Sequence, residues 1–184
     1  MTHSSSSTPA ELAESFPADF AWGVATAAYQ IEGAAQEGGR GPSIWDTFSH
    51  TPGLTHRGDT GDIACDHYHR WESDLDLMVS LCIRSYRLSL SWSRLQPTGA
   101  GALNPVAVEF YRNLLQGLKD REITPFVTLY HWDLPAALES EGGWANRQTA
   151  YLFGSYVGQV ITELGALAEH WITLNEPWCS AFLG

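Results

Sequence analysis

The chain has 184 residues, which is enough for one ordinary domain or for part of a larger one. It carries 21 acidic and 10 basic side chains, a formal charge of −11, and this balance argues against a nucleic-acid-binding protein, whose footprint is a basic patch. Because 44% of the residues are hydrophobic and 12% are aromatic, the chain can bury a core, which excludes an intrinsically disordered protein.

The N-terminal segment and the cysteines point to the cellular compartment. Residues 1–15 are rich in Ser, Thr and Pro and lack the apolar stretch of a signal peptide, so we expect a disordered tail. No run of about 18 apolar residues occurs, so neither a transmembrane helix nor a membrane partner is expected. The three cysteines form no CxxC pair and no disulfide framework, which is typical of the reducing cytoplasm. We therefore expect a cytoplasmic protein.

The predicted elements alternate between strands and helices. Strands are expected where apolar, aromatic and β-branched residues gather, at residues 16–25, 83–92, 123–130 and 169–174. Helices are expected between them, at residues 63–81 with Asp62 as N-cap, 104–121 with Pro105 in the first turn, and 146–164 with Asn146 as N-cap. This alternation implies an α/β fold with a parallel sheet and helical crossovers, either a (β/α)8 barrel or a doubly wound sheet.

Polar residues follow the carboxyl ends of three of the predicted strands. They are Gln30 and Glu32 after the first, His131, Trp132 and Asp133 after the third, and Asn175 and Glu176 after the fourth. In both candidate folds this edge of the sheet carries the functional site. Neither GxGxxG nor GxxxxGK[ST] occurs, so we expect no nucleotide and no other cofactor.

Arg87 lies in the middle of the second predicted strand, opposite the hydrophobic face formed by Tyr86, Leu88, Leu90 and Trp92. It should therefore enter the sheet interior or a barrel lumen. A buried guanidinium is costly unless it meets a carboxylate. One interpretation is an ion pair with a local Asp or Glu, and the other is that Arg87 orients a catalytic carboxylate.

Glu176 ends the last predicted strand and precedes Pro177, which favours an extended backbone at Glu176. Near the apolar Trp178 and Phe182, its carboxyl group could hold a proton and donate it, although a solvated loop carboxylate is the plain alternative. For His131 the plain alternative is a packed or hydrogen-bonded histidine. His67 and His69 point to different sides of a helix, so no metal site is predicted.

Five segments resemble glycoside hydrolase family 1, and the bacterial β-glucosidases within it most of all. They are FAWGVATAAYQIEG (20–33), GRGPSIWD (39–46), YRLSLSWSR (86–94), PFVTLYHWDLP (125–135) and HWITLNEPW (170–178). The resemblance implies a TIM barrel in place of a doubly wound sheet. Residues 16–184 would form the N-terminal half of the glycoside hydrolase domain, with the first four βα units of an incomplete (β/α)8 barrel.

The resemblance also implies roles for individual residues. Glu176 matches the general acid/base, and Asn175 the residue that contacts the sugar 2-hydroxyl. Arg87 matches the arginine that pairs with the catalytic nucleophile. The positions that hold the non-reducing-end sugar are matched by Gln30, His131 and Trp132. The chain has Cys82 where a glycine is common, a departure expected to affect packing.

The nucleophile of the family lies in a Thr-Glu-Asn-Gly motif, and no such motif occurs in this sequence. Retaining glycosidases need two carboxyl groups about 5–5.5 Å apart. We therefore expect a fragment of a retaining β-glucosidase that acts on terminal β-D-glucosyl residues of β-glucosides or cello-oligosaccharides, with residues 1–184 inactive alone. The alternative is a non-catalytic sugar-binding remnant of the same fold. Glucose, galactose and 6-phosphosugars all stay open as the preferred sugar, as does the oligomeric state.

Overall fold

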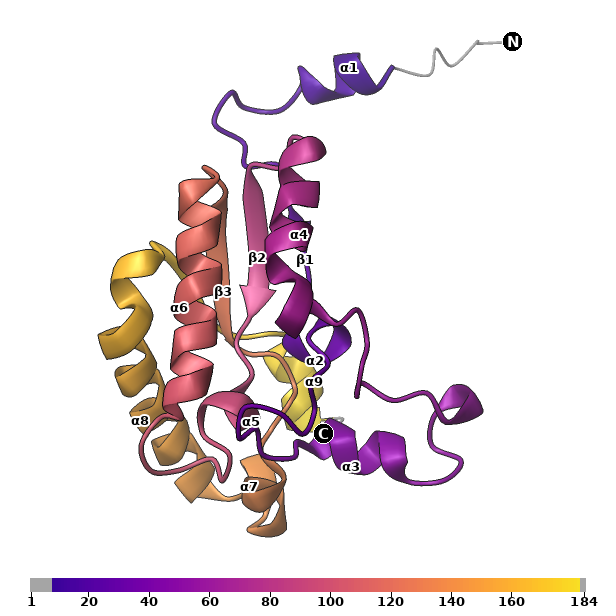
Figure 1. Ribbon diagram of the computed structural model, residues 1–184, viewed down its shortest axis with the longest axis vertical. Coiled ribbons are helices and arrows are strands. Elements are labelled where there is room, and N and C mark those ends of the chain that lie inside the picture. The colour runs from indigo at the N-terminus through magenta and orange to yellow at the C-terminus, as the bar shows by residue number, and fades with distance from the viewer. Residues whose placement is uncertain (1–7, 183–184) are drawn as a thin grey trace.

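The computed structural model describes residues 8–182 and contains one parallel sheet. Its four strands are neighbours in chain order, β1-β2-β3-β4. They are β1 (Val24–Ala25), β2 (Ser85–Ser89), β3 (Thr124–Tyr130) and β4 (His170–Leu174). Long helices connect successive strands and lie together along one side of the sheet (Figure 1). A doubly wound sheet would carry helices on both faces, so the arrangement is that of the first four βα units of a (β/α)8 barrel, as predicted.

The three long crossover helices are α4 (His67–Ser80), α6 (Pro105–Asp120) and α8 (Arg147–Leu164). Asn104 and Asn146 cap α6 and α8 by accepting hydrogen bonds from the second backbone amide of each helix, which confirms the predicted N-cap at Asn146 and the predicted first-turn position of Pro105. The predicted N-cap Asp62 is wrong. Helix α4 begins only at His67, after Asp66 in a left-handed conformation, and the Asp62 carboxylate is 3.0 Å from the His50 ring instead.

The main core lies between the helices and one face of the sheet. Leu75 of α4, Leu114 and Leu118 of α6, and Val160 of α8 are fully or almost fully buried against Tyr86, Leu88 and Val127 of the strands. Trp92 stacks on Tyr156 of α8 with a centroid distance of 5.1 Å. Trp92 opens α5 (Trp92–Leu95), so the predicted second strand extends too far.

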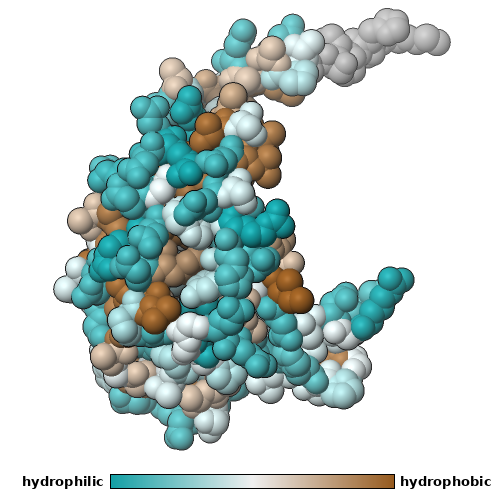
Figure 2. Space-filling model, viewed as in Figure 1, coloured by the Kyte–Doolittle hydropathy of each residue, from teal (hydrophilic) through white to brown (hydrophobic). Residues whose placement is uncertain are grey.

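The first predicted strand is also too long, because only Val24 and Ala25 of residues 16–25 pair with β2. Ahead of them Phe16, Phe20 and Trp22 form an aromatic cluster with centroid distances of 4.6–4.8 Å. These three side chains are 41–56% exposed. Figure 2 shows hydrophobic residues along the hollowed side of the molecule, close to this N-terminal segment.

The predicted disordered tail, residues 1–15, lies partly outside the described residues. Within the described part, α1 (Pro9–Ala13) is a short helix with a capping box between Thr8 and Glu11 and no buried residue. Disorder of the tail as a whole stays a prediction. No helix between residues 8 and 182 is long and apolar enough to cross a membrane.

Short elements that periodicity does not predict gather beyond the carboxyl ends of the strands (Figure 1). They are α2 (Ala28–Ile31), α3 (Ile44–His50), η1 (His56–Gly58), α7 (Ala136–Ser140), η2 (Gly143–Ala145) and α9 (Pro177–Phe182), while η3 (Gly165–Leu167) lies just before β4. Backbone hydrogen bonds from Ile44 to Leu134 and from Ala136 to Pro42 tie the loop before α3 to the loop after β3. The two loops thereby hold each other at this edge.

Candidate active site

Arg87 lies on the face of β2 that points away from the long helices. Its Nη2 donates to Asn175 Oδ1 at 2.7 Å and its Nε donates to Thr128 Oγ1 at 3.1 Å. The arginine ion pairs of residues 8–182 involve other arginines, and none includes Arg87. A local ion pair with Asp or Glu is therefore not found, and the half-buried guanidinium meets only neutral partners within the described chain.

Asn175 continues the pairing of β3 and β4 by one residue. Its backbone N–H donates to the Tyr130 carbonyl at 2.9 Å, and its own carbonyl accepts from Trp132 Nε1 at 3.1 Å. The side chain is buried, with Oδ1 occupied by Arg87, while Nδ2 makes no hydrogen bond to a described residue. The amide is thus held in one orientation with its donor group available.

Glu176 does not have the extended backbone predicted from Pro177. Its φ is 43°, in the left-handed region, because the chain turns at once from β4 into α9. A non-glycine residue in this region costs on the order of 1–3 kcal/mol, and such strain tends to occur at functional sites. The carboxylate is exposed and accepts a hydrogen bond from the Cys179 thiol at 3.1 Å.

His131 and Trp132 follow β3 directly. His131 is partly buried, and its Nδ1 is inaccessible and has no hydrogen-bond partner among the described residues. Burial and the Arg87 charge lower the pKa of His131, and the Glu176 charge opposes them. The ring is therefore neutral near pH 7 and lies within electrostatic reach of both charges. Trp132 has a φ of 74° and is fixed by its hydrogen bond to Asn175.

Gln30 lies on α2, beyond the carboxyl end of β1. Its side chain is exposed and makes no hydrogen bond to another described residue. The structure thus brings Arg87, His131, Trp132, Asn175 and Glu176 into direct or electrostatic contact. It places Gln30 on α2, with no side-chain hydrogen bond to any of them.

The other two polar residues of this edge, Glu32 and Asp133, are buried beneath the site. Glu32 is 4% exposed and accepts hydrogen bonds from Arg94 Nε at 2.9 Å and from the Tyr111 hydroxyl at 2.6 Å. Asp133 is 1% exposed, and neither of its carboxylate oxygens has a hydrogen-bond partner among the described residues. Burial raises the pKa of Asp133 to about 7.

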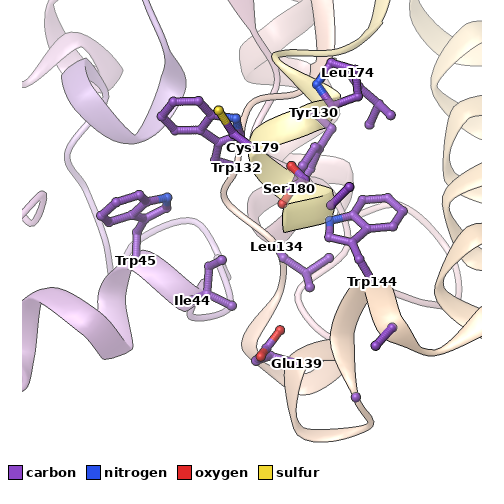
Figure 3. A pocket seen from close by; sticks show the side chains of 14 residues that line it. Ile44, Trp45, Tyr130, Trp132, Leu134, Glu139, Trp144, Leu174, Cys179 and Ser180 are labelled. Carbon is purple, nitrogen blue, oxygen red and sulfur yellow. The ribbon is translucent and has the colours of Figure 1, made fainter. Parts of the chain in front are cut away.

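An aromatic cavity of about 760 Å³ adjoins the site. Figure 3 shows Trp45 and Trp132 on one side of it and Trp144 on the other, with Cys179 and Ser180 of α9 between them and Glu139 at the far end. Trp45 and Trp144 are not among the residues that the sequence predicts for the site. Trp45 could have been predicted from the GRGPSIWD motif, which contains it. Nothing in the periodicity around Trp144 distinguishes that residue from a core residue.

Within residues 8–182 no group of three or more His, Cys, Asp or Glu side chains could hold a metal ion. His67 Nδ1 is 2.6 Å from Asp74, and His69 lies between Asp66 and Glu37. The His67 contact is thus internal to α4, whereas His69 joins α4 to Asp66 and Glu37, and the two histidines do not converge on one point.

The parallel βα units and the polar residues at the carboxyl ends of the strands are those of the first part of a (β/α)8 barrel. Residues 12–184 match the family model for glycosyl hydrolase family 1, and the chain belongs to this family. Over 169 residues it is 52% identical to β-glucosidase A of Thermotoga maritima and 57% identical to thermostable β-glucosidase B of Thermobispora bispora. Each match covers 92% of this chain, but only 38% and 35% of the respective relative.

Solved structures agree with the fold. The AHE enzyme from Alicyclobacillus herbarius superposes with a TM-score of 0.89 at 55% identity, and the Thermotoga maritima β-glucosidase in complex with deoxynojirimycin with 0.90 at 51% identity. Both matches cover 92% of this chain and 38% of the other chain. The chain therefore spans well under half the length of the enzymes that it resembles.

Proposed function

We propose that this chain is the N-terminal part of a retaining β-glucosidase that removes terminal β-D-glucosyl residues from β-glucosides or cello-oligosaccharides. The observation that carries the proposal is Arg87, a partly buried guanidinium that contacts Asn175 next to Glu176 and has no carboxylate partner in the described chain. A catalytic nucleophile supplied by the remaining part of the barrel would provide the missing charge.

In this proposal Glu176 first protonates the leaving oxygen of the glycoside. After the nucleophile has formed the glycosyl-enzyme intermediate, Glu176 takes a proton from the water that hydrolyses it. Its carboxylate is exposed within the described residues, so a substrate and a water molecule can reach it. Asn175 Nδ2 would donate to the sugar 2-hydroxyl, an interaction that strengthens in the oxocarbenium-like transition state.

The neutral His131 ring, the fixed Trp132 indole and Gln30 would bind the remaining hydroxyl groups of the sugar. A neutral imidazole can donate from one nitrogen and accept at the other, as a polyhydroxylated ligand requires. We further infer that the protein acts in the cytoplasm, because Cys65, Cys82 and Cys179 are all free and two of them are exposed.

The test is to fuse this chain to the part of Thermotoga maritima β-glucosidase A that follows its matched region. We expect the fusion to hydrolyse an aryl β-glucoside and residues 1–184 alone not to. For a substrate whose leaving group must be protonated, such as cellobiose, Glu176→Gln should lower kcat/KM of the fusion by about 10²–10⁴-fold, the usual contribution of a general acid/base. Glu169→Gln is the matched control, since Glu169 is an exposed glutamate just before the same strand.

Equal activity of Glu176→Gln and Glu169→Gln would contradict the proposal. If the fusion binds glucose tightly but hydrolyses no glycoside, the alternative of a sugar-binding remnant gains support.

A further inference from the structure

A buried hydrogen-bond network joins the segment around α2, which follows β1, to α6, the crossover helix between β2 and β3. Glu32 directly follows α2, and its two carboxylate oxygens accept from Arg94 Nε and from the Tyr111 hydroxyl. Arg94 and Tyr111 are 1% and 0% exposed. Burial and the Glu32 charge raise the pKa of Tyr111 well above its ordinary value, so the tyrosine keeps the proton that it donates.

Arg94 and Tyr111, the partners of Glu32, make further hydrogen bonds that fix their positions. The Tyr111 hydroxyl accepts from the Ser91 backbone N–H at 2.7 Å, and Arg94 Nη2 donates to the Gly33 carbonyl at 2.9 Å. The Arg94 guanidinium also lies 4.4 Å from the centre of the Tyr68 ring. The carboxyl end of α2 is thereby fixed to α4, α5 and α6 at once.

The first two residues of α2, Ala28 and Tyr29, are also held by tertiary hydrogen bonds. The Ala28 N–H donates to Ser89 Oγ at 2.8 Å, and the Tyr29 hydroxyl donates to the Trp45 carbonyl at 3.0 Å. Gln30 lies between these anchors and Glu32 and presents an exposed side chain. A single helical turn has no stability of its own, so the conformation of α2 depends on these tertiary anchors.

The small net stability of a buried ion pair favours a positioning role for the Glu32–Arg94–Tyr111 network over a purely stabilising one. A buried ion pair adds little net stability compared with well-packed apolar residues, but it fixes the geometry of the groups that it joins. A side chain carried on an ordered backbone leaves less conformational entropy to be lost when it binds a ligand. The residue that gains from an ordered α2 is Gln30.

We propose that Glu32, held by Arg94 and Tyr111, is a positioning residue that orders Gln30 for contact with the sugar. This inference rests on the proposed function, because it takes the sugar as the ligand of Gln30. Glu32 and Tyr111 are buried and act through Gln30, with no contact to the substrate.

Tyr111→Phe is the variant of choice, since it removes one hydrogen bond from Glu32 and leaves the ion pair with Arg94 intact. Glu32→Gln would leave a buried arginine uncompensated and could prevent folding. Tyr156→Phe is the matched control, because Tyr156 is equally buried on α8 and its hydroxyl donates to the Leu129 carbonyl, away from α2.

The kinetic arm is a double-mutant cycle in the fusion with the Thermotoga remainder. Tyr111→Phe should lower kcat/KM for an aryl β-glucoside about fivefold, equivalent to about 1 kcal/mol. In a Gln30→Ala background the same change should lower it less than about twofold, since there is no Gln30 left to order. Equal losses in both backgrounds, or an equal loss from Tyr156→Phe, would overturn the proposal.

The second arm is amide hydrogen exchange on the 184-residue chain, which needs no activity. The Gln30 and Glu32 amides donate to the carbonyls of Ala27 and Ala28. Their exchange should become at least about fivefold faster in Tyr111→Phe and stay unchanged in Tyr156→Phe. Unchanged exchange in Tyr111→Phe would overturn the proposal. If the fusion hydrolyses no β-glucoside, the proposed function fails, while this arm still decides whether Glu32 orders α2.

Discussion

At the scale of single residues, the most informative side chain is Arg87, which lies in the candidate active site without a carboxylate partner among the described residues. Its donors reach Thr128 and Asn175, which are neutral, so its charge is uncompensated within the described residues. The alternation of side chains along a strand predicts this placement, because Arg87 and the buried Tyr86 and Leu88 must face opposite sides. In the proposed function, the catalytic nucleophile in the remaining part of the barrel supplies the counter-charge.

Arg87→Met should therefore have different effects in the 184-residue chain and in the fusion with the Thermotoga remainder. In the 184-residue chain it should change the free energy of unfolding by less than about 1 kcal/mol, because a costly unpaired charge leaves together with its hydrogen bonds. In the fusion it should lower kcat/KM at least about 100-fold, since the nucleophile loses its counter-ion. Denaturant unfolding and steady-state kinetics measure the two effects, and a fusion variant with unchanged kcat/KM would refute the pairing.

Asp133 should make stability depend on pH. Burial raises its pKa to about 7, above the value near 3.9 of an unfolded chain. The folded protein thus binds the proton more tightly, and this stabilisation is present below about pH 4 and lost as the pH rises toward 7, by about 4 kcal/mol at most.

Asp133→Asn should remove this dependence and raise the melting temperature at pH 8 relative to the parent chain, with little change at pH 4.5. Asp19→Asn, at an exposed aspartate, is the control. A parent chain and an Asp133→Asn chain with parallel stability profiles between pH 4.5 and 8 would contradict the buried carboxyl as the cause.

At the scale of elements, the C-termini of α4 and α6 share one unusual feature. Both end in a Schellman motif, with Ile83 N–H bonded to Met78 O and Ile123 N–H bonded to Leu118 O. The residues that must adopt the left-handed conformation are Cys82 with φ 57° and Glu122 with φ 56°, where glycine is favoured. The departure at Cys82 thus affects the backbone more than the packing.

Cys82→Gly and Glu122→Gly should each raise the free energy of unfolding by about 1 kcal/mol, because glycine relieves the left-handed strain. Ser80→Gly, two residues earlier and in the helix itself, should lower it by about 0.5 kcal/mol. Urea unfolding of the three variants measures the sign of each change in the free energy of unfolding. A loss of stability in Cys82→Gly would show that the thiol makes a contribution that outweighs the strain.

Long periodic elements could be predicted from the sequence, and short ones could not. The helices capped by Asn104 and Asn146 follow from periodicity and capping chemistry. In contrast, α2, α3 and α9 are shorter than the window in which periodicity can be recognised, and tertiary contacts such as Glu32–Arg94 hold α2. The left-handed turn at Glu176 depends on α9 and was therefore missed, and the predicted N-cap Asp62 failed because Asp66 and the turn before it displaced the helix start.

At the scale of the whole molecule, the sheet has unpaired edges. Within the described residues β1 pairs only with β2, and β4 only with β3. The aromatic cluster of Phe16, Phe20 and Trp22 is exposed at the start of β1, and Trp178 and Phe182 are 61% and 72% exposed after β4. Open edges and exposed apolar surface favour association, so the remaining part of a barrel is expected to cover both.

The 184-residue chain should therefore bind a hydrophobic dye such as ANS strongly and self-associate in size-exclusion chromatography, and the fusion should do neither. Phe20→Ser should reduce dye binding by the chain, because it removes one of the three mutually contacting rings of the aromatic cluster. Leu77→Ser is the control, since Leu77 is 57% exposed on α4, away from the sheet edge. Equal dye binding by the chain and the fusion would mean that the barrel does not close.

The most direct measurement of the central claim is azide rescue of Glu176→Gly in the fusion with 2,4-dinitrophenyl β-glucoside as substrate. This leaving group needs no proton, so the first step should persist, while hydrolysis of the intermediate lacks its base. Azide needs no base, so it should raise turnover at least about tenfold and yield β-glucosyl azide. Turnover that is unaffected by azide, or a product of α configuration, would contradict Glu176 as the general acid/base of a retaining β-glucosidase.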